Sequence, residues 1–399
     1  MLNLYVYLDL NKHIKSRFYY PKIDFIANSK TNTQNTNFQF TNLQNYEVII
    51  PNIEKSAHSS SIVDIGDKLM VVYFAGSKEG ARDVKIYQAF INKNKVSDKN
   101  SVDINDADNT NGVAEILGEP KSILDSKMLS LLSGKFIKNL GNPVVFRDLN
   151  NKIHFFVVGV SLGGWATSKI YQLEFNENLN SLIYKGELQL GAMANFSHLI
   201  RTLPVLLQNG GFILPYYHEL ARKYSLVAFF DSNAKYIYSK KINNLNNLLQ
   251  PSVALLDPKN CLVFFRNYKE GKALIQECSN SGDFWKKPST SNLFNYGSSS
   301  VLISFMNEDR NNILLIHNDG KTATNDNARS SISLYYLKNK ETNEFIHLIN
   351  LDKDKEEVSY PSAIIDESYL HITYTNDRKN IKYKAISLES INKLIKELQ

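Results

Sequence analysis

The sequence is poor in the residues that build cross-linked, fibrous or membrane-spanning proteins. Its 399 residues include only two cysteines, 10 prolines and 18 glycines. Two cysteines are too few for a disulfide framework or a cysteine-rich zinc or iron–sulfur site, and so little proline and glycine excludes a collagen-like or linker-like chain. No run of 18 apolar residues occurs, so no segment is expected to cross a bilayer by itself.

An excess of charge of one sign is also missing. Lysine and arginine number 46 against 40 aspartates and glutamates, which leaves a net charge of +6 without clusters. Nucleic-acid binding needs a basic face, so nucleic acid is not an expected partner, whereas a mild positive balance suits an acidic small substrate. The 8 histidines are scattered and no glycine-rich phosphate loop occurs, so we expect neither a metal nor a cofactor. The hydrophobic content of 43% is enough for a packed core.

The first ten residues leave two interpretations of the compartment. Met1–Leu10 is partly apolar, but it contains Asn3 and Asp9 and lacks the basic start and small-residue cleavage site of a signal peptide. We therefore expect a cytoplasmic protein whose first residues form a strand. In the alternative, Leu2–Leu8 and the basic residues after it are the tail of a trimmed anchor, which would place the protein in the periplasm or on a membrane.

Most of the chain reads as short strands rich in Val, Ile, Phe and Tyr, separated by Asn, Asp and Gly turns. An apolar strand, a polar turn and a second apolar strand recur six times, and a third strand-like segment follows each pair. One such unit cannot bury both of its faces alone, but a closed ring of units can. The repeats therefore predict an all-β, six-bladed β-propeller. The six units are Ser61–Phe74, Pro143–Val158, Pro204–Tyr216, Pro251–Phe265, Val301–His317 and Pro361–Tyr374.

Two segments have helical rather than strand spacing of apolar residues. Ile123–Leu132 is predicted as a helical insertion in the first or second blade, and Leu388–Leu398 as a short amphipathic end helix. We accordingly divide the chain into an N-terminal strand and loop segment (1–45), the propeller (46–386) and a C-terminal helix (387–399). The sequence does not indicate an oligomeric state.

Polar residues at the ends of the inner strands should meet near the axis, because these strands converge there. Arginine binds a carboxylate through two parallel hydrogen bonds, so several arginines at such positions predict an acidic ligand. Each arginine alone could equally be a solvated strand end or a salt bridge between blades. The candidate arginines are Arg201, Arg266, Arg329 and Arg378. The other polar and aromatic candidates in strand ends and loops are His58, Asn142, Gln250, Asn318, Tyr374, Trp165 and Tyr217.

The order of these motifs resembles the sialidase-like (neuraminidase) family with Asp-box (BNR) repeats, in particular its bacterial and plant branch. One Asp box is present in worn form: Cys278, Asn280, Gly282, Phe284 and Trp285 match the pattern Ser-x-Asp-x-Gly-x-Thr-Trp. The other residues that carry the resemblance are His58–Ile62, Phe74–Gly76 with Glu79-Gly80 and Asp83-Val84, Gly141–Pro143, Gln250–Ser252, Phe265-Arg266, Arg329-Ser330, Ser359–Pro361 and His371–Thr375.

The resemblance implies an exo-glycosidase that cleaves a terminal sialic-acid-like (nonulosonic) or other acidic sugar from a glycan with retention. Sialidases use three arginines for the substrate carboxylate, and Arg266 and Arg329 match two of them by order. The place of the first arginine reads Ile49–Pro51 here. Arg201 or Arg378 would then complete the clamp.

The resemblance also assigns the catalytic groups. An anionic nucleophile would be repelled by the substrate carboxylate, and sialidases use a tyrosine instead. Tyr360 matches that nucleophile, Glu219 is the candidate base that takes its proton, and Asp83 and Glu79 are the candidate acids. Two alternatives stay open: a non-hydrolytic propeller that binds acidic glycans, and another carbohydrate-active enzyme, a lyase or transglycosylase, on the same site.

Overall fold

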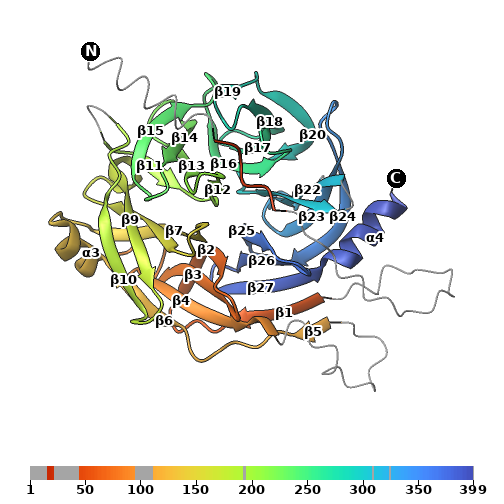
Figure 1. Cartoon of the computed structure of the whole chain (residues 1–399). Coiled ribbons are helices and arrows are strands. Elements are labelled where there is room, and N and C mark those ends of the chain that lie inside the picture. The colour runs from red at the N-terminus through yellow and green to blue at the C-terminus, as the bar shows by residue number, and fades with distance from the viewer. Residues whose placement is uncertain are drawn as a thin grey trace, which may run out of the picture.

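The computed structural model describes residues 16–21, 45–94, 111–191, 195–307, 310–322 and 325–398. Within them, six predominantly antiparallel sheets stand around a common axis as the blades of a propeller (Figure 1). The six-bladed β-propeller predicted from the repeats is therefore confirmed. The interpretation of Met1–Leu10 falls outside the described residues. No helix in the described part of the chain is long and apolar enough to cross a membrane.

The first three blades follow one another along the chain. Blade 1 contains β2 (Ser56–Asp64), β3 (Lys68–Gly76), β4 (Lys85–Asn92) and β6 (Lys121–Asp125). Blade 2 contains β7 (Asn139–Arg147), β8 (Ile153–Val160), β9 (Ser168–Asn176) and β10 (Ser181–Glu187), with the short 3₁₀-helix η1 (Gly164–Thr167) between β8 and β9. Blade 3 contains β11 (His198–Ile200), β12 (Val205–Leu206), β13 (Phe212–His218), β14 (Tyr224–Phe230) and β15 (Tyr236–Lys241).

The last three blades complete the ring. Blade 4 contains β16 (Leu248–Leu255), β17 (Cys261–Asn267), β18 (Gly271–Ser279), β19 (Phe284–Trp285) and β20 (Ser289–Asn295). Blade 5 contains β21 (Val301–Asn307), β22 (Arg310–Asn318), β23 (Ser331–Asn339) and β24 (Glu344–Lys353). Blade 6 contains β25 (Val358–Ile365), β26 (Tyr369–Asn376), β27 (Asn380–Ser387), β1 (Asn45–Ile50) and β5 (Asn111–Val113).

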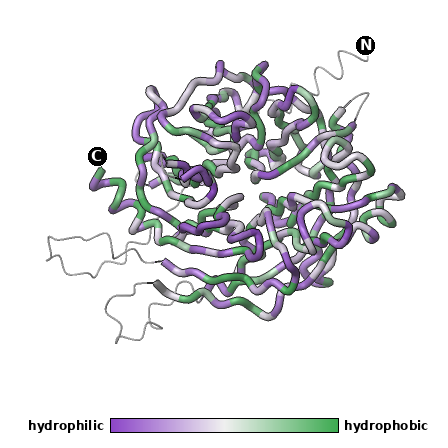
Figure 2. Tube along the Cα trace, turned by 180° about the vertical axis from the view of Figure 1, so that it is seen from behind, coloured by the Kyte–Doolittle hydropathy of each residue, from purple (hydrophilic) through white to green (hydrophobic). Residues whose placement is uncertain are grey.

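The hydrophobic core is divided among the spaces between neighbouring blades. One cluster joins Val72 and Ile86 of blade 1 to Val145 and Phe155 of blade 2. All eight residues of β8 are buried, because a strand inside the ring has a neighbouring blade on each face. This explains why the inner strands read as continuous apolar runs. Apolar segments are accordingly spread over the whole ring in Figure 2.

The ring is closed by the first described strand. β1 pairs antiparallel with β27, the third strand of blade 6, and parallel with β5. Tyr46 of β1 also makes an edge-to-face contact with Tyr369, with 5.8 Å between ring centroids. The last blade is thus built from both ends of the described chain, and this pairing removes an open edge.

Both predicted helices are present. α3 (Ser126–Ser133) joins blades 1 and 2: the Asp125 carboxylate accepts a hydrogen bond from the Met128 N–H (2.7 Å) at its start, and Gly134 ends it with a φ of 67°. α4 (Leu388–Glu397) follows β27 directly and buries one apolar face against blades 5 and 6. This face consists of Leu388, Ile391, Leu394 and Ile395.

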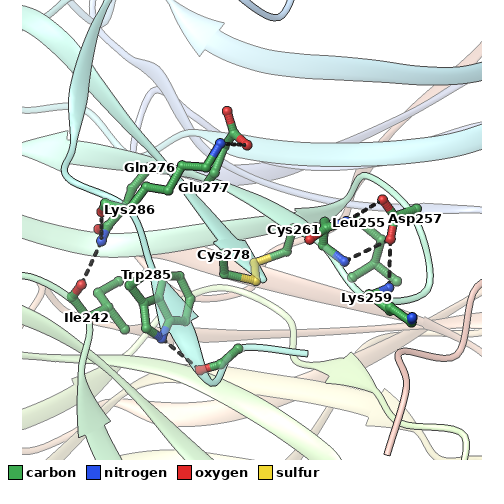
Figure 3. The surroundings of a disulfide bond; sticks show 12 residues. Ile242, Leu255, Asp257, Lys259, Cys261, Gln276, Glu277, Cys278, Trp285 and Lys286 are labelled. Atoms are coloured by element: carbon green, nitrogen blue, oxygen red, sulfur yellow. Dashed lines mark hydrogen bonds and ion pairs between the residues drawn. A yellow bond between two sulfur atoms is a disulfide. The ribbon is translucent and has the colours of Figure 1, made fainter. Parts of the chain in front are cut away.

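The two cysteines form a disulfide, which the sequence did not predict. Cys261 of β17 and Cys278 of β18 lie opposite each other in the antiparallel ladder and are bonded (Figure 3). The worn Asp box begins at Cys278, and the Trp285 indole N–H donates to the Gly282 carbonyl across its turn (2.8 Å). The two cysteines therefore fasten β17 to β18 within blade 4.

Candidate functional site

Four of the inner strands are interrupted at the same place by a two-residue bulge. The strand registers skip Ser59-Ser60 in β2, Asn142-Pro143 in β7, Gln250-Pro251 in β16 and Tyr360-Pro361 in β25. The first residue of each pair has a positive φ of 55°, 39°, 45° and 54°, respectively. Bulges re-aim side chains next to functional sites, and strained left-handed residues other than glycine concentrate there. We call the end of the ring that carries these bulges the arginine end.

Tyr360 lies at the centre of this arrangement. The guanidinium carbons of Arg201, Arg266 and Arg329 lie 5.3, 5.9 and 5.5 Å from its ring centroid, and the His58 ring lies 4.2 Å away. The Arg266 Nη1 also donates to the Tyr360 hydroxyl (2.9 Å). Burial alone would raise the pKa of Tyr360, but the charges of Arg266 and Arg329 outweigh it and lower the pKa below its usual value. The surrounding arginines therefore favour loss of the Tyr360 hydroxyl proton.

Arg201 is bound to main-chain carbonyls, and the expectation that it would complete a carboxylate clamp stays a prediction. Its Nη1 donates to the Ser60 carbonyl (3.1 Å), and its Nη2 donates to the carbonyls of Tyr360 and Pro361, the latter at 2.7 Å. The side chain is 3% exposed, and burial lowers the pKa of Arg201 to about 10. Among the described residues no carboxylate pairs with it. Its Nη1 and Nη2 donors therefore hold the two bulges of blades 1 and 6, whereas its buried Nε has no partner among the described residues.

Arg329 and Arg378 share a glutamate that sequence reasoning missed. Arg329 Nη1 lies 3.0 Å from Glu357 Oε1, and Arg378 Nε lies 2.5 Å from Glu357 Oε2. Burial would raise the pKa of Glu357, but the hydrogen bond from Arg378 and the charge of Arg329 lower it to about 2. Glu357 is therefore ionised and balances much of the charge of both arginines. Its one signal in the sequence is its place three residues before Tyr360.

The two candidate acids are placed differently. Glu79 Oε2 accepts a hydrogen bond from Arg378 Nη1 (2.7 Å), which brings Glu79 to the arginine cluster. Asp83 accepts from the Ser77 N–H (3.0 Å) and the Ser77 hydroxyl (2.9 Å), and these bonds lower its pKa. Asp83 is therefore an ionised residue that closes the turn between β3 and β4, whereas Glu79 contacts the site.

Glu219 lies directly after β13 and close to Arg266. Burial raises the pKa of Glu219, although the charge of Arg266 acts in the opposite direction. Next to it, the buried Tyr217 hydroxyl accepts a 3.4 Å hydrogen bond from Gln250 Nε2. Gln250 Oε1 and Arg266 Nε are both buried and have no partner among the described residues. Unpaired buried groups of this kind are costly, so they indicate where a polar ligand would bind.

His58 lies beside Tyr360, and two further predicted residues, Asn142 and Trp165, lie at the bulge of blade 2. Both ring nitrogens of His58 lack a partner among the described residues, and burial, reinforced by the charge of Arg378, lowers its pKa so that the ring is neutral. Asn142 Oδ1 accepts from the Ser59 hydroxyl (3.1 Å). The Trp165 indole packs on Gly141, where an added Cβ would lie 2.6 Å from the ring. These residues surround the bulges of blades 1 and 2.

Two predicted residues belong to the scaffold instead. Asn318 donates to the carbonyls of Ser331 (2.8 Å) and Val358 (2.5 Å) and thereby joins blades 5 and 6. The Tyr374 hydroxyl donates to Asp352 (2.7 Å), and its ring is fully buried in the core between the same two blades. Neither side chain is placed to contact a ligand at Tyr360, because both are committed to the contact between blades.

The charges of the site nearly cancel. Four arginines and three glutamates gather around Tyr360, so the group carries one positive charge in excess when all of them are ionised. A ligand with a single negative charge would balance this excess. The arginines are Arg201, Arg266, Arg329 and Arg378, and the glutamates are Glu79, Glu219 and Glu357.

The propeller has the fold of sialidases. It superimposes on a Hadza microbial sialidase with a TM-score of 0.64 at 12% identity, over 84% of this chain and 66% of that one. It also matches the structure of Trypanosoma rangeli sialidase in complex with sialic acid. The TM-score is 0.58 at 11% identity, over 90% of this chain and 60% of that one. A protein of unknown function from Dyadobacter fermentans matches with a TM-score of 0.63 at 12% identity, over 86% of this chain and 97% of that one.

A family model described as a BNR repeat-like domain matches residues 67–372, so the chain belongs to this sialidase-like BNR family. A search of curated proteins finds no match. The chain spans two thirds or less of the length of the two sialidases, and at 11–12% identity these likenesses establish the fold of a sialidase-type glycoside hydrolase.

Proposed function

We propose that the protein is a retaining exo-glycosidase that removes a terminal sialic-acid-like sugar from a glycan. The observation that carries the proposal is the arrangement of arginines around Tyr360. The pKa of Tyr360 is lowered, Arg266 donates a hydrogen bond to its hydroxyl, and further guanidinium groups lie around its ring. A neutral tyrosine is the nucleophile suited to an anomeric carbon that carries a carboxylate, because it is not repelled before it reacts.

The reaction then proceeds in two displacements. The Tyr360 oxygen attacks the anomeric carbon while its proton passes to Glu219, whose raised pKa makes it a suitable base. The bond to the leaving oxygen breaks as an acid on the β3–β4 loop protonates that oxygen. Water then attacks the anomeric carbon from the side opposite Tyr360 and gives a proton to the loop carboxylate that acted as the acid. The bond between this carbon and the Tyr360 oxygen breaks, and Glu219 returns its proton to the phenolate. Tyr360 is thereby regenerated and the configuration is retained overall. Glu79 is our candidate acid because it contacts the arginine cluster.

The substrate carboxylate is best accommodated at Arg266. Arg329 and Arg378 already face Glu357, and Arg201 is committed to carbonyl groups. Among the described residues, Arg266 donates only to the Tyr360 hydroxyl, and its own buried Nε has no partner. The excess of one positive charge fits a sugar with one carboxylate.

The test is hydrolysis of a fluorogenic sialoside by the purified protein, with Tyr360→Phe as the matched variant. Turnover by the wild type that falls at least about 10³-fold in Tyr360→Phe would support the proposal, because a step that needs the phenol oxygen is removed. Equal turnover by both proteins would contradict it. Proton NMR of the first product formed would show whether the anomeric configuration is retained.

A non-hydrolytic role is the second candidate, and the ion pair between Glu79 and Arg378 (2.7 Å) favours it, since this contact engages the candidate acid within the arginine cluster. A protein of this kind would bind sialic acid in calorimetry without cleaving sialosides. A transglycosylase would instead release the leaving group only when an acceptor glycan is added, and a lyase would form an unsaturated sugar.

A further inference from the structure

A group of exposed apolar side chains lies beside the site, on α3 and the neighbouring β8–β9 loop. Large exposed apolar patches on a soluble protein mark contacts with partners or membranes. Leu131 is 85% exposed, Leu162 68% and Phe136 57%. We call this group the rim patch; it consists of Met128, Leu131, Leu132, Phe136 and Leu162.

The rim patch is held firmly. Leu129, on the other face of α3, is fully buried in the core between blades 1 and 2. The Ser161 hydroxyl donates to the Phe136 carbonyl (2.9 Å), which ties the β8–β9 loop to the segment after the helix. Lys135 pairs with Glu187 of β10 (2.6 Å). The outward apolar side chains are therefore presented by an anchored element, and Figure 1 shows α3 at the outer edge of the ring beside β10.

Positive charge exceeds negative charge around the rim patch, although Asp125 caps α3 and Glu187 pairs with Lys135. The segment 126–138 contains Lys127, Lys135 and Lys138 and no acidic residue. Exposed leucine and phenylalanine with lysines beside them suit the surface of a bilayer that contains anionic lipids. The apolar side chains enter the headgroup layer, and the lysines pair with the lipid phosphates.

The rim patch lies at the arginine end of the ring. Asp125, which caps α3, pairs with Lys85 at the start of β4, and β4 begins just after the loop that carries Glu79. From the other side, Asn139 at the start of β7 donates to the Gly80 carbonyl of the same loop (2.7 Å). A surface that contacts the rim patch therefore also lies close to the opening of the site.

We propose that the rim patch docks the protein on a bilayer containing anionic lipids, with the arginine end beside the membrane surface. This docking does not depend on the proposed hydrolysis. Where both hold, the sugars within reach are those carried by membrane-bound glycoconjugates.

The experiment is co-sedimentation of the purified full chain with phosphatidylcholine vesicles, with and without phosphatidylglycerol. We expect the wild type to pellet with the anionic vesicles, less at high salt, and the double variant Leu131→Asn/Phe136→Asn to bind at least about tenfold more weakly. Lys127→Glu/Lys138→Glu should remove the preference for anionic vesicles. The matched control is Leu179→Asn, since Leu179 is 72% exposed but lies in the turn between β9 and β10 at the other end of the blade; it should bind as the wild type does.

Three outcomes would overturn the proposal. The wild type would sediment with neither vesicle, or Leu179→Asn and the rim-patch variant would lose vesicle binding equally. In the third outcome, light scattering would show a wild-type dimer that becomes a monomer in the rim-patch variant, so that a second copy of the chain would be the occupant. All five residues to be changed are on the surface, and circular dichroism verifies that the variants fold. Sialoside turnover, measured in parallel, keeps a failure of docking distinct from a failure of the proposed function.

Discussion

Arg201 of blade 3 and Tyr360 of blade 6 lie on opposite sides of the ring, and the guanidinium of Arg201 donates to the main-chain carbonyl of Tyr360. The same guanidinium stands 5.3 Å from the Tyr360 ring. One buried arginine thus holds the strained backbone of the candidate nucleophile and also supplies positive charge to its ring. Arg201 therefore contributes both to the packing of the ring and to the candidate site.

Replacing Arg201 should therefore lower stability as well as activity. Arg201→Met leaves the carbonyls of Ser60, Tyr360 and Pro361 without their donor, and we expect a loss of about 3 kcal/mol in the free energy of unfolding. Urea denaturation measures it. Tyr360→Phe keeps all three carbonyl bonds and should unfold within about 1 kcal/mol of the wild type. An Arg201→Met protein as stable as the wild type would show that these bonds contribute little.

Tyr360 should ionise below the usual tyrosine pKa. Arg266 and Arg329 favour its phenolate, whereas burial raises the pKa of Tyr217 and of most other buried tyrosines. Absorbance at 295 nm against pH should show one early transition that Tyr360→Phe removes. Arg266→Met should move this transition to higher pH. If the early transition persists in Tyr360→Phe, it belongs to another tyrosine.

Glu357 predicts how stability depends on pH. Its pKa in the folded protein is about 2, below the ordinary value of 4.5, so its contribution is complete above about pH 4.5 and is lost as the pH falls toward 2. The full contribution is on the order of 3 kcal/mol. Unfolding free energies measured between pH 6 and pH 2.5 should fall less steeply in Glu357→Gln than in the wild type. Identical slopes would show that Arg329 and Arg378 do not hold this carboxylate ionised.

Glu79 and Asp83 can be separated by matched amides. Glu79→Gln removes the carboxylate that contacts Arg378, and we expect sialoside turnover to fall about 10²-fold or more. Asp83→Asn changes a carboxylate bound to Ser77, so it should alter the rate less than tenfold. The reverse order of effects would move the acid to Asp83. Equal binding of sialic acid by both variants would show that the loss concerns the chemical step.

The disulfide should stabilise blade 4. Cys261 and Cys278 are 17 residues apart in sequence, and closing a loop of this length contributes about 3 kcal/mol. We expect Cys261→Ser/Cys278→Ser to lower the free energy of unfolding by about this amount, measured in urea. Adding a reductant to the wild type should have the same effect and none on the double variant. A reductant that destabilises both proteins equally would point to a different target.

The repeats made the architecture predictable, because a strand, turn and strand motif repeated six times has few ways to bury its faces. The grouping of Arg266, Arg329 and Tyr360 expected from them is present in the structure. Arg266 lies near the end of an inner hairpin, Tyr360 lies near the start of one, and Arg329 lies in the loop before β23. The function of these residues stays a prediction.

A place at the end of an inner strand does not decide whether a side chain faces the axis or a neighbouring blade. Side chains alternate between the faces of a strand, and a bulge shifts that alternation. Tyr374 and Asn318 occupy ends of inner hairpins, as the candidates at the site do, but their side chains enter the contact between blades 5 and 6. Glu357 was missed because no strand pattern shows that two arginines from other parts of the chain converge on it.

The pairing of β1 with β27 has a consequence for how the protein is made. The ribosome synthesises β1 long before its partner exists, so the last blade cannot be completed until nearly the whole chain has emerged. Until then the growing protein carries open strand edges, which are prone to pair with other chains. Slow translation near β27 would prolong this exposure, and crowded nascent chains would have time to aggregate.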